Sequence, residues 1–235
     1  MERLNPQQSR LILRAPSTFS LVTEAVEDNL LTALRRFRSL SQVAVIRFDD
    51  LPTICVTSAT EMFYSLASLQ SLYEVPVVRL TPARVTIARN SHQGRTEAQS
   101  YYQSGSQSYF VSLPGAPLKH LFWVAILRCG GEEEVDRYED AFFRVRVSPE
   151  FALLPHERHH VTWCNMLARQ PVTLSILAKA TGHTRSAAAV FLAACDELGI
   201  LERQDVNSPA MLAIAGDRAA ERSTARKLVQ SLGFR

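Results

Sequence analysis

The pattern of apolar positions predicts short strands and one helix in the first part of the chain. Apolar residues recur at helical spacing between residues 21 and 37, after a short apolar run at 11–13 that indicates a strand. A short helix or turn is expected at 69–73. Five further runs have the composition of strands: 43–48, 53–57, 61–66, 75–80 and 84–88. We expect residues 1–90 to form a small α+β domain in which a helix packs on an antiparallel sheet.

Residues 91–112 interrupt this pattern. Serine, glutamine and tyrosine dominate there, and aliphatic residues almost disappear. Such a composition is typical of a linker or a long loop. The chain therefore divides into an N-terminal domain, this segment, and a C-terminal domain at 113–235.

The C-terminal domain is predicted to be mainly helical. Residues 118–129 are strongly apolar and predict a buried helix, and the glutamates at 132–134 predict an acidic loop. Alternation at 141–147 predicts a strand in which Phe143, Val145 and Val147 share one face. A further helix is expected at 156–169, after Pro155.

Residues 173–202 predict two helices joined by a tight turn. Gly182 suits the left-handed end of the first helix, and Thr184 can cap the second helix. The second helix has a predicted buried face made of Ala188, Phe191, Leu192, Cys195 and Leu198. A second wing strand at 211–215 and a basic helix from Asp217 are expected to follow.

This stretch resembles the winged helix-turn-helix of bacterial regulators. The preceding strand at 144–147, the Leu154-Pro155-His156 segment and residues 174–201 also resemble uncharacterised bacterial regulatory proteins. The resemblance implies a C-terminal winged-helix domain and a regulatory role, and it transfers no activity.

Bulk composition excludes few functions. The chain has 235 residues, of which 46% are hydrophobic and 21% charged, and its formal net charge is +3. That charge is too small to indicate nucleic-acid binding by itself. The four cysteines are far apart, which favours free thiols and a cytoplasmic setting. No run is long enough to predict membrane insertion or a signal peptide.

Residues 156–160 match the H-E-x-x-H pattern of zinc proteases. His156 and His160 would share one face of a helix, with Glu157 as the base. However, the motif directly follows Pro155, and Trp163 and Met166 stand where an extended motif would supply glycine and a third histidine. We therefore expect a polar helix N-terminus and no metal site.

No phosphate-binding loop, dinucleotide-binding motif or nucleophile elbow is present. No nucleophile is paired with a base in the sequence pattern. We therefore expect a protein that is not an enzyme and needs no cofactor.

The predicted outward side of the second helix is small and apolar. It consists of Ala187, Ala189, Val190 and Ala193. Exposed apolar surfaces usually contact other proteins. The sequence therefore favours a regulatory or adaptor protein whose winged helix binds a protein partner or a second copy of the chain.

Two alternatives remain open. A DNA-binding regulator would use polar residues of the same helix and the basic C-terminal helix: Arg185, Ser186, Arg218, Arg222, Arg226 and Lys227. An effector of a guanine nucleotide messenger would use one of two arginine groups: Arg35, Arg36 and Arg38, or Arg144 and Arg146.

Overall fold

The structure is a computed structural model that describes residues 20–24, 29–40, 43–58, 60–82, 84–89 and 115–204. The chain mixes helices and antiparallel sheets, which confirms the α+β class. It divides into two compact units. The N-terminal unit comprises Met1–Ser68 and Val78–Leu118, and the C-terminal unit comprises Leu69–Val77 and Lys119–Arg235. Residues 69–77, expected in the first domain, thus belong to the C-terminal unit.

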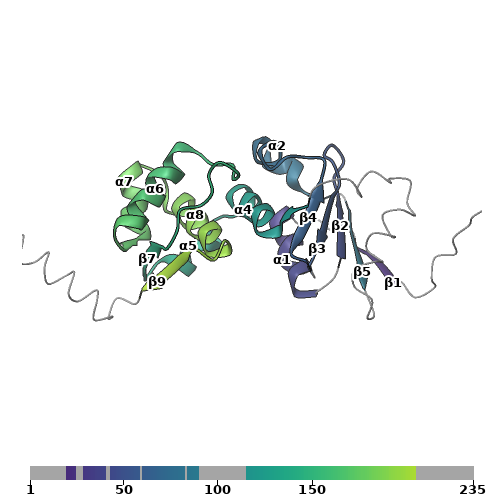
Figure 1. The fold of residues 1–235 in the computed structure, drawn as a ribbon, viewed down its shortest axis with the longest axis horizontal. Coiled ribbons are helices and arrows are strands. Elements are labelled where there is room, and N and C mark those ends of the chain that lie inside the picture. The colour runs from purple at the N-terminus through teal and green to yellow at the C-terminus, as the bar shows by residue number, and fades with distance from the viewer. Residues whose placement is uncertain are drawn as a thin grey trace, which may run out of the picture. The chain divides into compact units, whose positions relative to one another are not determined.

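The N-terminal unit is a six-stranded antiparallel sheet with the order β1-β5-β2-β3-β4-β6 (Figure 1). Its strands are β1 (Ser20–Glu24), β2 (Val43–Arg47), β3 (Ile54–Thr57), β4 (Met62–Ser65), β5 (Arg84–Arg89) and β6 (Ala116–Pro117). Helix α1 (Leu30–Leu40) lies along one face of the sheet and buries Leu30, Leu34 and Phe37. The predicted strands at 43–48, 53–57 and 61–66 are confirmed.

Two predictions in this unit are wrong. Residues 21–24 form strand β1 and not the start of a helix, because Val22 and Thr23 pair with Ile87 and Thr86 of β5. Pairing with a neighbouring strand overrides an apolar spacing that also fits a helix. In addition, Val77–Leu80 forms a 3₁₀ turn where the sequence indicated a strand. The predicted strand at 11–13 and the linker at 91–112 lie outside the described residues.

The C-terminal unit is mostly helical and contains a three-stranded sheet with the order β8-β7-β9. Its helices are α2 (Leu69–Glu74), α4 (Leu118–Cys129, with Leu118 in the other unit), α5 (Glu133–Tyr138), α6 (Arg158–Arg169), α7 (Leu174–Thr181) and α8 (Arg185–Glu197). Its strands are β7 (Phe142–Val145), β8 (Val172–Thr173) and β9 (Leu201–Gln204). The predicted strand at 141–147 thus ends early, and Val147 is 65% exposed.

The two-helix stretch folds locally as its sequence predicts. Gly182 ends α7 with φ of 70°, a conformation that costs glycine little. The Thr184 hydroxyl accepts a hydrogen bond from the Ala187 backbone N–H at 3.1 Å and so caps α8. The segment from Asp205 onward, with the predicted wing strand and final helix, lies outside the described residues.

Phe191 of α8 is the centre of the C-terminal core. Its ring packs against Trp123 of α4 at 6.0 Å, against Trp163 of α6 at 5.4 Å, and in a stack with His160 of α6 at 5.2 Å between ring centroids. Each tryptophan N–H is also satisfied, Trp123 by the Pro155 carbonyl and Trp163 by the Leu177 carbonyl. One side chain thus connects three helices.

The predicted docking face of α8 is wrong. Ala188 to Cys195 are all buried, including Ala189, Val190 and Ala193, which the sequence placed outward. A helix that is apolar on all sides is a central helix, and this one is enclosed. Ala187 is only partly exposed and lines a cavity described below.

Helix α5 explains why the alanine side is covered. The sequence indicated an acidic loop at 132–134, but Glu133 begins a helix that packs along α8. Asp196 of α8 accepts hydrogen bonds from Arg137 and Tyr138, and Arg185 forms an ion pair with Glu139. Arg185 and Asp196 lie on the same side of the helix as Ala189 and Ala193, so α5 covers the alanines.

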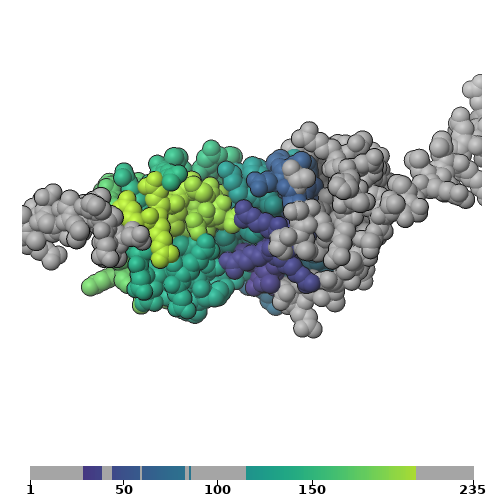
Figure 2. All heavy atoms as spheres, turned by 90° about the horizontal axis from the view of Figure 1, so that it is seen from below, coloured from purple at the N-terminus to yellow at the C-terminus, as the bar shows by residue number. Residues whose placement is uncertain are grey.

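Figure 2 shows the surface of this unit from below. The yellow-green atoms of the end of α8 and of β9 lie against teal atoms of earlier elements, consistent with the packing of α5 on α8 and of β7 on β9. None of the helices in the described ranges is both long and apolar enough to span a bilayer.

Ala189→Arg should destabilise the protein. Ala189 is fully buried, so the substitution buries a charge or forces α5 away from α8. We expect a loss of about 4 kcal/mol in the free energy of unfolding, measured by urea denaturation. Ala168→Arg, at an exposed position of α6, is the matched control and should change stability by less than about 0.5 kcal/mol. Equal stability of the two variants would contradict the buried position of Ala189.

Candidate functional site

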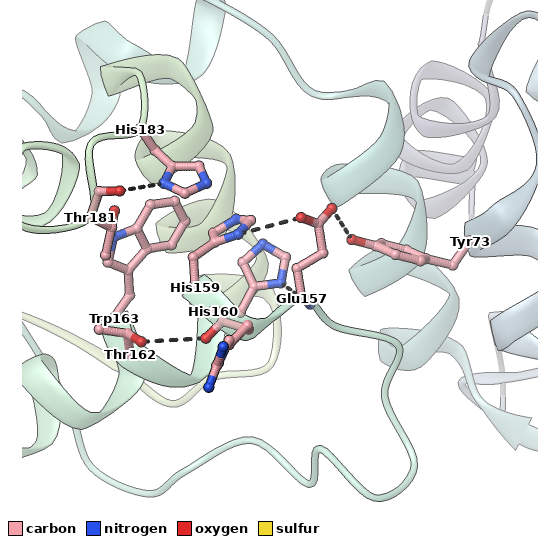
Figure 3. Close-up of polar contacts among 9 residues, drawn as sticks. Tyr73, Glu157, His159, His160, Thr162, Trp163, Thr181 and His183 are labelled. Carbon is pink, nitrogen blue, oxygen red and sulfur yellow. Dashed lines mark hydrogen bonds and ion pairs between the residues drawn. The ribbon is translucent and has the colours of Figure 1, made fainter.

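The most concentrated set of polar side chains surrounds the N-terminus of α6. Glu157 precedes this helix and lies between two partners (Figure 3). One carboxylate oxygen accepts a hydrogen bond from the Tyr73 hydroxyl at 3.1 Å, and the other lies 3.4 Å from Nδ1 of His159. The carboxylate therefore orients His159 and leaves its Nε2 available.

The ring of His159 packs against that of a second histidine. Its ring centroid is 4.0 Å from that of His183, which lies in the turn between α7 and α8. Nδ1 of His183 is 3.0 Å from the Thr181 carbonyl oxygen. A carbonyl only accepts, so this nitrogen carries the proton and Nε2 of neutral His183 has a lone pair. Two imidazoles with a free Nε2 thus lie in contact.

A third histidine lies deeper. His160 is 5% exposed, and its Nδ1 accepts a hydrogen bond from the Glu157 backbone N–H at 3.0 Å. Neutral His160 therefore carries its proton on Nε2. Because its ring also stacks on Phe191, the position of this histidine depends on the core.

These side chains line a cavity of about 400 Å³ that lies wholly within the C-terminal unit. Its walls come from α2, α4, the start of α6, and the turn and first residues of α8. The lining residues are Tyr73, Leu127, Arg128, Gly130, Glu157, His159, His160, His183, Thr184, Ser186, Ala187 and Val190. A cavity of this size fits a small organic molecule.

Arg128 contributes a fixed positive charge to this wall. One terminal nitrogen donates a hydrogen bond to the Val75 carbonyl at 3.1 Å, and the guanidinium carbon lies 5.5 Å from the centre of the Tyr73 ring. Its Nε is buried and has no hydrogen-bond partner. A buried donor without a partner is costly, and this nitrogen is shielded from solvent.

Burial sets the protonation of the site. It lowers the pKa of His160 to about 3, with a further contribution from the neighbouring histidines. Burial and the adjacent His183 also lower the pKa of His159. The pKa of Tyr73 is raised to about 12 by burial and by Glu157. Near neutral pH His159 and His160 are therefore neutral, and the Tyr73 phenol is protonated.

The first histidine of the H-E-x-x-H motif lies outside the helix that carries the second. Helix α6 begins at Arg158, so His156 lies outside it; its Nδ1 is 2.9 Å from the Leu154 carbonyl oxygen and its ring packs on Phe151. The two motif histidines therefore do not share a helical face. Within the part of the chain that the structure describes, no three His, Cys, Asp or Glu side chains are placed to hold a metal ion.

The polar residues predicted on α8 have other roles. Arg185 forms the ion pair with Glu139, and Ser186 lines the cavity. The remaining candidates for DNA contact, Arg218, Arg222, Arg226 and Lys227, lie outside the described residues, so that interface stays a prediction.

The two predicted arginine groups lie in different units. Arg35, Arg36 and Arg38 are on the exposed side of α1 in the N-terminal unit. Arg144 of β7 and Arg146, which directly follows this strand, are exposed in the C-terminal unit, and Nε of Arg146 is 2.6 Å from Glu202. Neither group lines the histidine cavity.

The arrangement is suited to binding. Among the described residues no hydroxyl group is hydrogen-bonded to His159 or His183, and the Thr184 hydroxyl is used as the cap of α8. The site offers a fixed cation, polarisable imidazoles and a helix N-terminus around an open volume.

The low pKa of buried His160 should make the stability of the protein depend on pH. Its pKa is lower in the folded protein than in the unfolded chain, so the unfolded chain binds more protons below about pH 6.5. Stability should therefore fall as the pH is lowered from 6.5 towards 3, with His160 contributing a slope of up to about 1.4 kcal/mol per pH unit.

Urea denaturation of the wild type and His160→Gln at several pH values measures this slope. The variant should lose stability less steeply on acidification, even if it is less stable at pH 7. NMR of the histidine rings provides the independent measurement, since His160 should stay neutral at pH 5. Protonation of His160 near pH 6.5 would contradict its buried, stacked position.

Comparison of the chain with known protein families, with curated proteins and with solved structures finds no match. The resemblance to winged-helix regulators therefore stays a prediction, and the functional argument depends on the residues of the cavity.

Proposed function

We propose that the chain is a non-enzymatic regulatory protein whose winged-helix-like C-terminal unit binds a small ligand in the histidine cavity. The observation that carries the proposal is the convergence of Arg128, Glu157, His159 and His183 on one open volume within this unit. Ligand pockets typically combine apolar walls with a few converging polar groups. Leu127, Gly130, Ala187 and Val190 supply the apolar part.

The order of elements supports the winged-helix part of the proposal. Helix α6, strand β8, helices α7 and α8 and strand β9 follow one another as in a winged helix, and β9 would be the first wing strand. Strand β7, from upstream of α6, pairs with both β8 and β9. The middle of the small sheet is therefore occupied by a strand that precedes the motif.

Burial of α8 argues against the usual use of such a motif. A recognition helix must present polar side chains to a DNA groove. Here the residues from Ala188 to Cys195 are enclosed, and Arg185 is paired with Glu139. The same burial argues against protein docking through the alanines, because they are not on the surface. DNA or protein contacts would need a surface other than the middle of this helix.

The position of the cavity suggests how a ligand could regulate the protein. Its walls include the first residues of α8, the end of α4 and Tyr73 of α2. A ligand that contacts all of these elements stabilises the conformation in which they lie close together. The shift in the conformational equilibrium is set by the difference in the ligand's affinity for the two conformations. We place this regulation in the cytoplasm, in keeping with four cysteines that are not joined in disulfides.

Filling the cavity should abolish ligand retention. Ala187 lines the cavity at the first turn of α8, so Ala187→Phe places a ring in the open volume. We expect wild-type protein incubated with a small-molecule extract and then desalted to release a retained compound on denaturation, detected by mass spectrometry. The Ala187→Phe variant should retain at least about tenfold less, which corresponds to about 1.4 kcal/mol.

Ala180→Phe provides the matched control, because Ala180 is exposed on α7 and does not line the cavity. It should retain the compound like the wild type, and circular dichroism should show that both variants are folded. Equal retention by the wild type and Ala187→Phe, or no retained compound in either, would count against the proposed function. If the full chain protects a specific DNA sequence from nuclease digestion, that result would favour the DNA-binding alternative instead.

A further inference from the structure

We propose that residues 69–77, which contain α2, form a detachable strap on one side of the histidine cavity. The strap docks on the C-terminal unit and leaves it without unfolding of that unit, and its release removes one wall of the cavity. Docking of the strap is a property of the chain without a ligand. This inference therefore goes beyond the proposed function and does not depend on it.

The place of the strap in the chain is unusual. Leu69–Val77 belongs to the C-terminal unit, whereas the residues on both sides of it, up to Ser68 and from Val78 onward, belong to the N-terminal unit. The strap is thus connected at both ends to the other unit. Its position on the C-terminal unit depends on non-covalent contacts alone.

Helix α2 is too short to be stable by itself. It has six residues, and Pro76 disfavours a helical conformation at the residue before it, so the helix ends at Glu74. Isolated helices shorter than about 12 residues are marginal in water. Leu72 is its one buried residue, whereas α8 is buried from Ala188 to Cys195. The stability of α2 must therefore come from the contacts that dock it.

Two polar contacts dock the strap. The Tyr73 hydroxyl donates a hydrogen bond to Glu157 at 3.1 Å (Figure 3). Arg128 of α4 donates a hydrogen bond to the Val75 carbonyl at 3.1 Å, and its guanidinium carbon lies 5.5 Å from the centre of the Tyr73 ring. The Glu157 side chain is 56% exposed, so water can replace the Tyr73 hydroxyl when the strap leaves. The net stabilisation from such a hydrogen bond is small.

Release of the strap changes one wall and leaves the rest of the site in place. Tyr73 is the lining residue that α2 supplies. Glu157 keeps its contact with His159 and its backbone hydrogen bond to His160, since neither involves the strap. The cavity therefore opens on the side of α2 while the histidines remain. Because both ends of the strap continue into the N-terminal unit, its movement links this wall to that unit.

Hydrogen exchange of the full chain, followed by NMR without any ligand, tests the strap. Segments with few buried apolar contacts open locally at a lower free energy than global unfolding requires. We expect the amides of Tyr73 and Glu74 to be protected at least about tenfold less than those of Phe191 and Leu192. Their exchange should also depend much less on low concentrations of urea, because local opening exposes little surface.

A pair of tyrosine variants locates the first docking contact. Tyr73→Phe removes only the hydroxyl, so exchange of the amides at positions 73 and 74 should become at least about threefold faster. Tyr138→Phe is the matched control, because the Tyr138 hydroxyl also donates to a carboxylate, that of Asp196, in the contact between α5 and α8. It should leave the exchange of α2 unchanged.

A pair of arginine variants tests the second contact. Arg128→Met removes the donor to Val75 and the charge beside the Tyr73 ring, so exchange of α2 should become at least about tenfold faster. Arg137→Met is the matched control, because Arg137 lies 5.3 Å from the centre of the Tyr138 ring and is bonded to Asp196. The tyrosine pair keeps the test decisive if Arg128→Met does not fold.

Three results would overturn the strap. If the amides of α2 exchange as slowly as those of α8 and with the same dependence on urea, α2 leaves only when the whole unit unfolds. If neither Tyr73→Phe nor Arg128→Met accelerates the exchange of α2, these contacts do not dock it. Equal acceleration of α2 by Tyr73→Phe and Tyr138→Phe would mean that the exchange reports global stability.

Discussion

The C-terminal unit depends on the packing of Phe191. Its ring contacts Trp123, His160 and Trp163, so a single side chain of α8 joins α4 and α6 through buried aromatic surface. Aromatic side chains bury large areas, and pairs of rings add roughly 1 kcal/mol each beyond that burial. The alanines around Phe191 have little volume, which lets α5 approach α8 closely. The helix therefore becomes the centre of the unit.

This packing also builds the candidate site. His160 contacts Phe191 with its ring and the Glu157 backbone with Nδ1, so the core fixes the residue that precedes α6. Glu157 then orients His159, and the αL turn at Gly182 brings His183 onto that ring. The cavity is thus bounded by side chains whose positions follow from the core. A ligand in it would contact the same elements that Phe191 holds together.

The limits of individual helices and turns could be predicted from the sequence better than the elements that pack against them. The end of α7 at Gly182, the cap at Thr184 and the limits of α4 follow from short-range patterns. The prediction of an outward apolar face on α8 was wrong. Periodicity identifies the most apolar side of a helix, but it does not show how many sides other elements cover. The run from Ala187 to Cys195 is apolar on every side, which is the signal of a central helix.

The sequence by itself determined the α+β class, most strands of the first sheet and the helix-turn-helix stretch, because turn chemistry and apolar spacing act over a few residues. It also contained the histidines of the 156–160 motif, where a polar helix N-terminus and no metal site were expected. Only the tertiary structure brought Tyr73, Arg128, His159 and His183 to one cavity. Their spacing along the chain carries no pattern, since they come from α2, α4, α6 and the turn before α8. Contact between distant segments is decided by core packing, and here by the ring of Phe191.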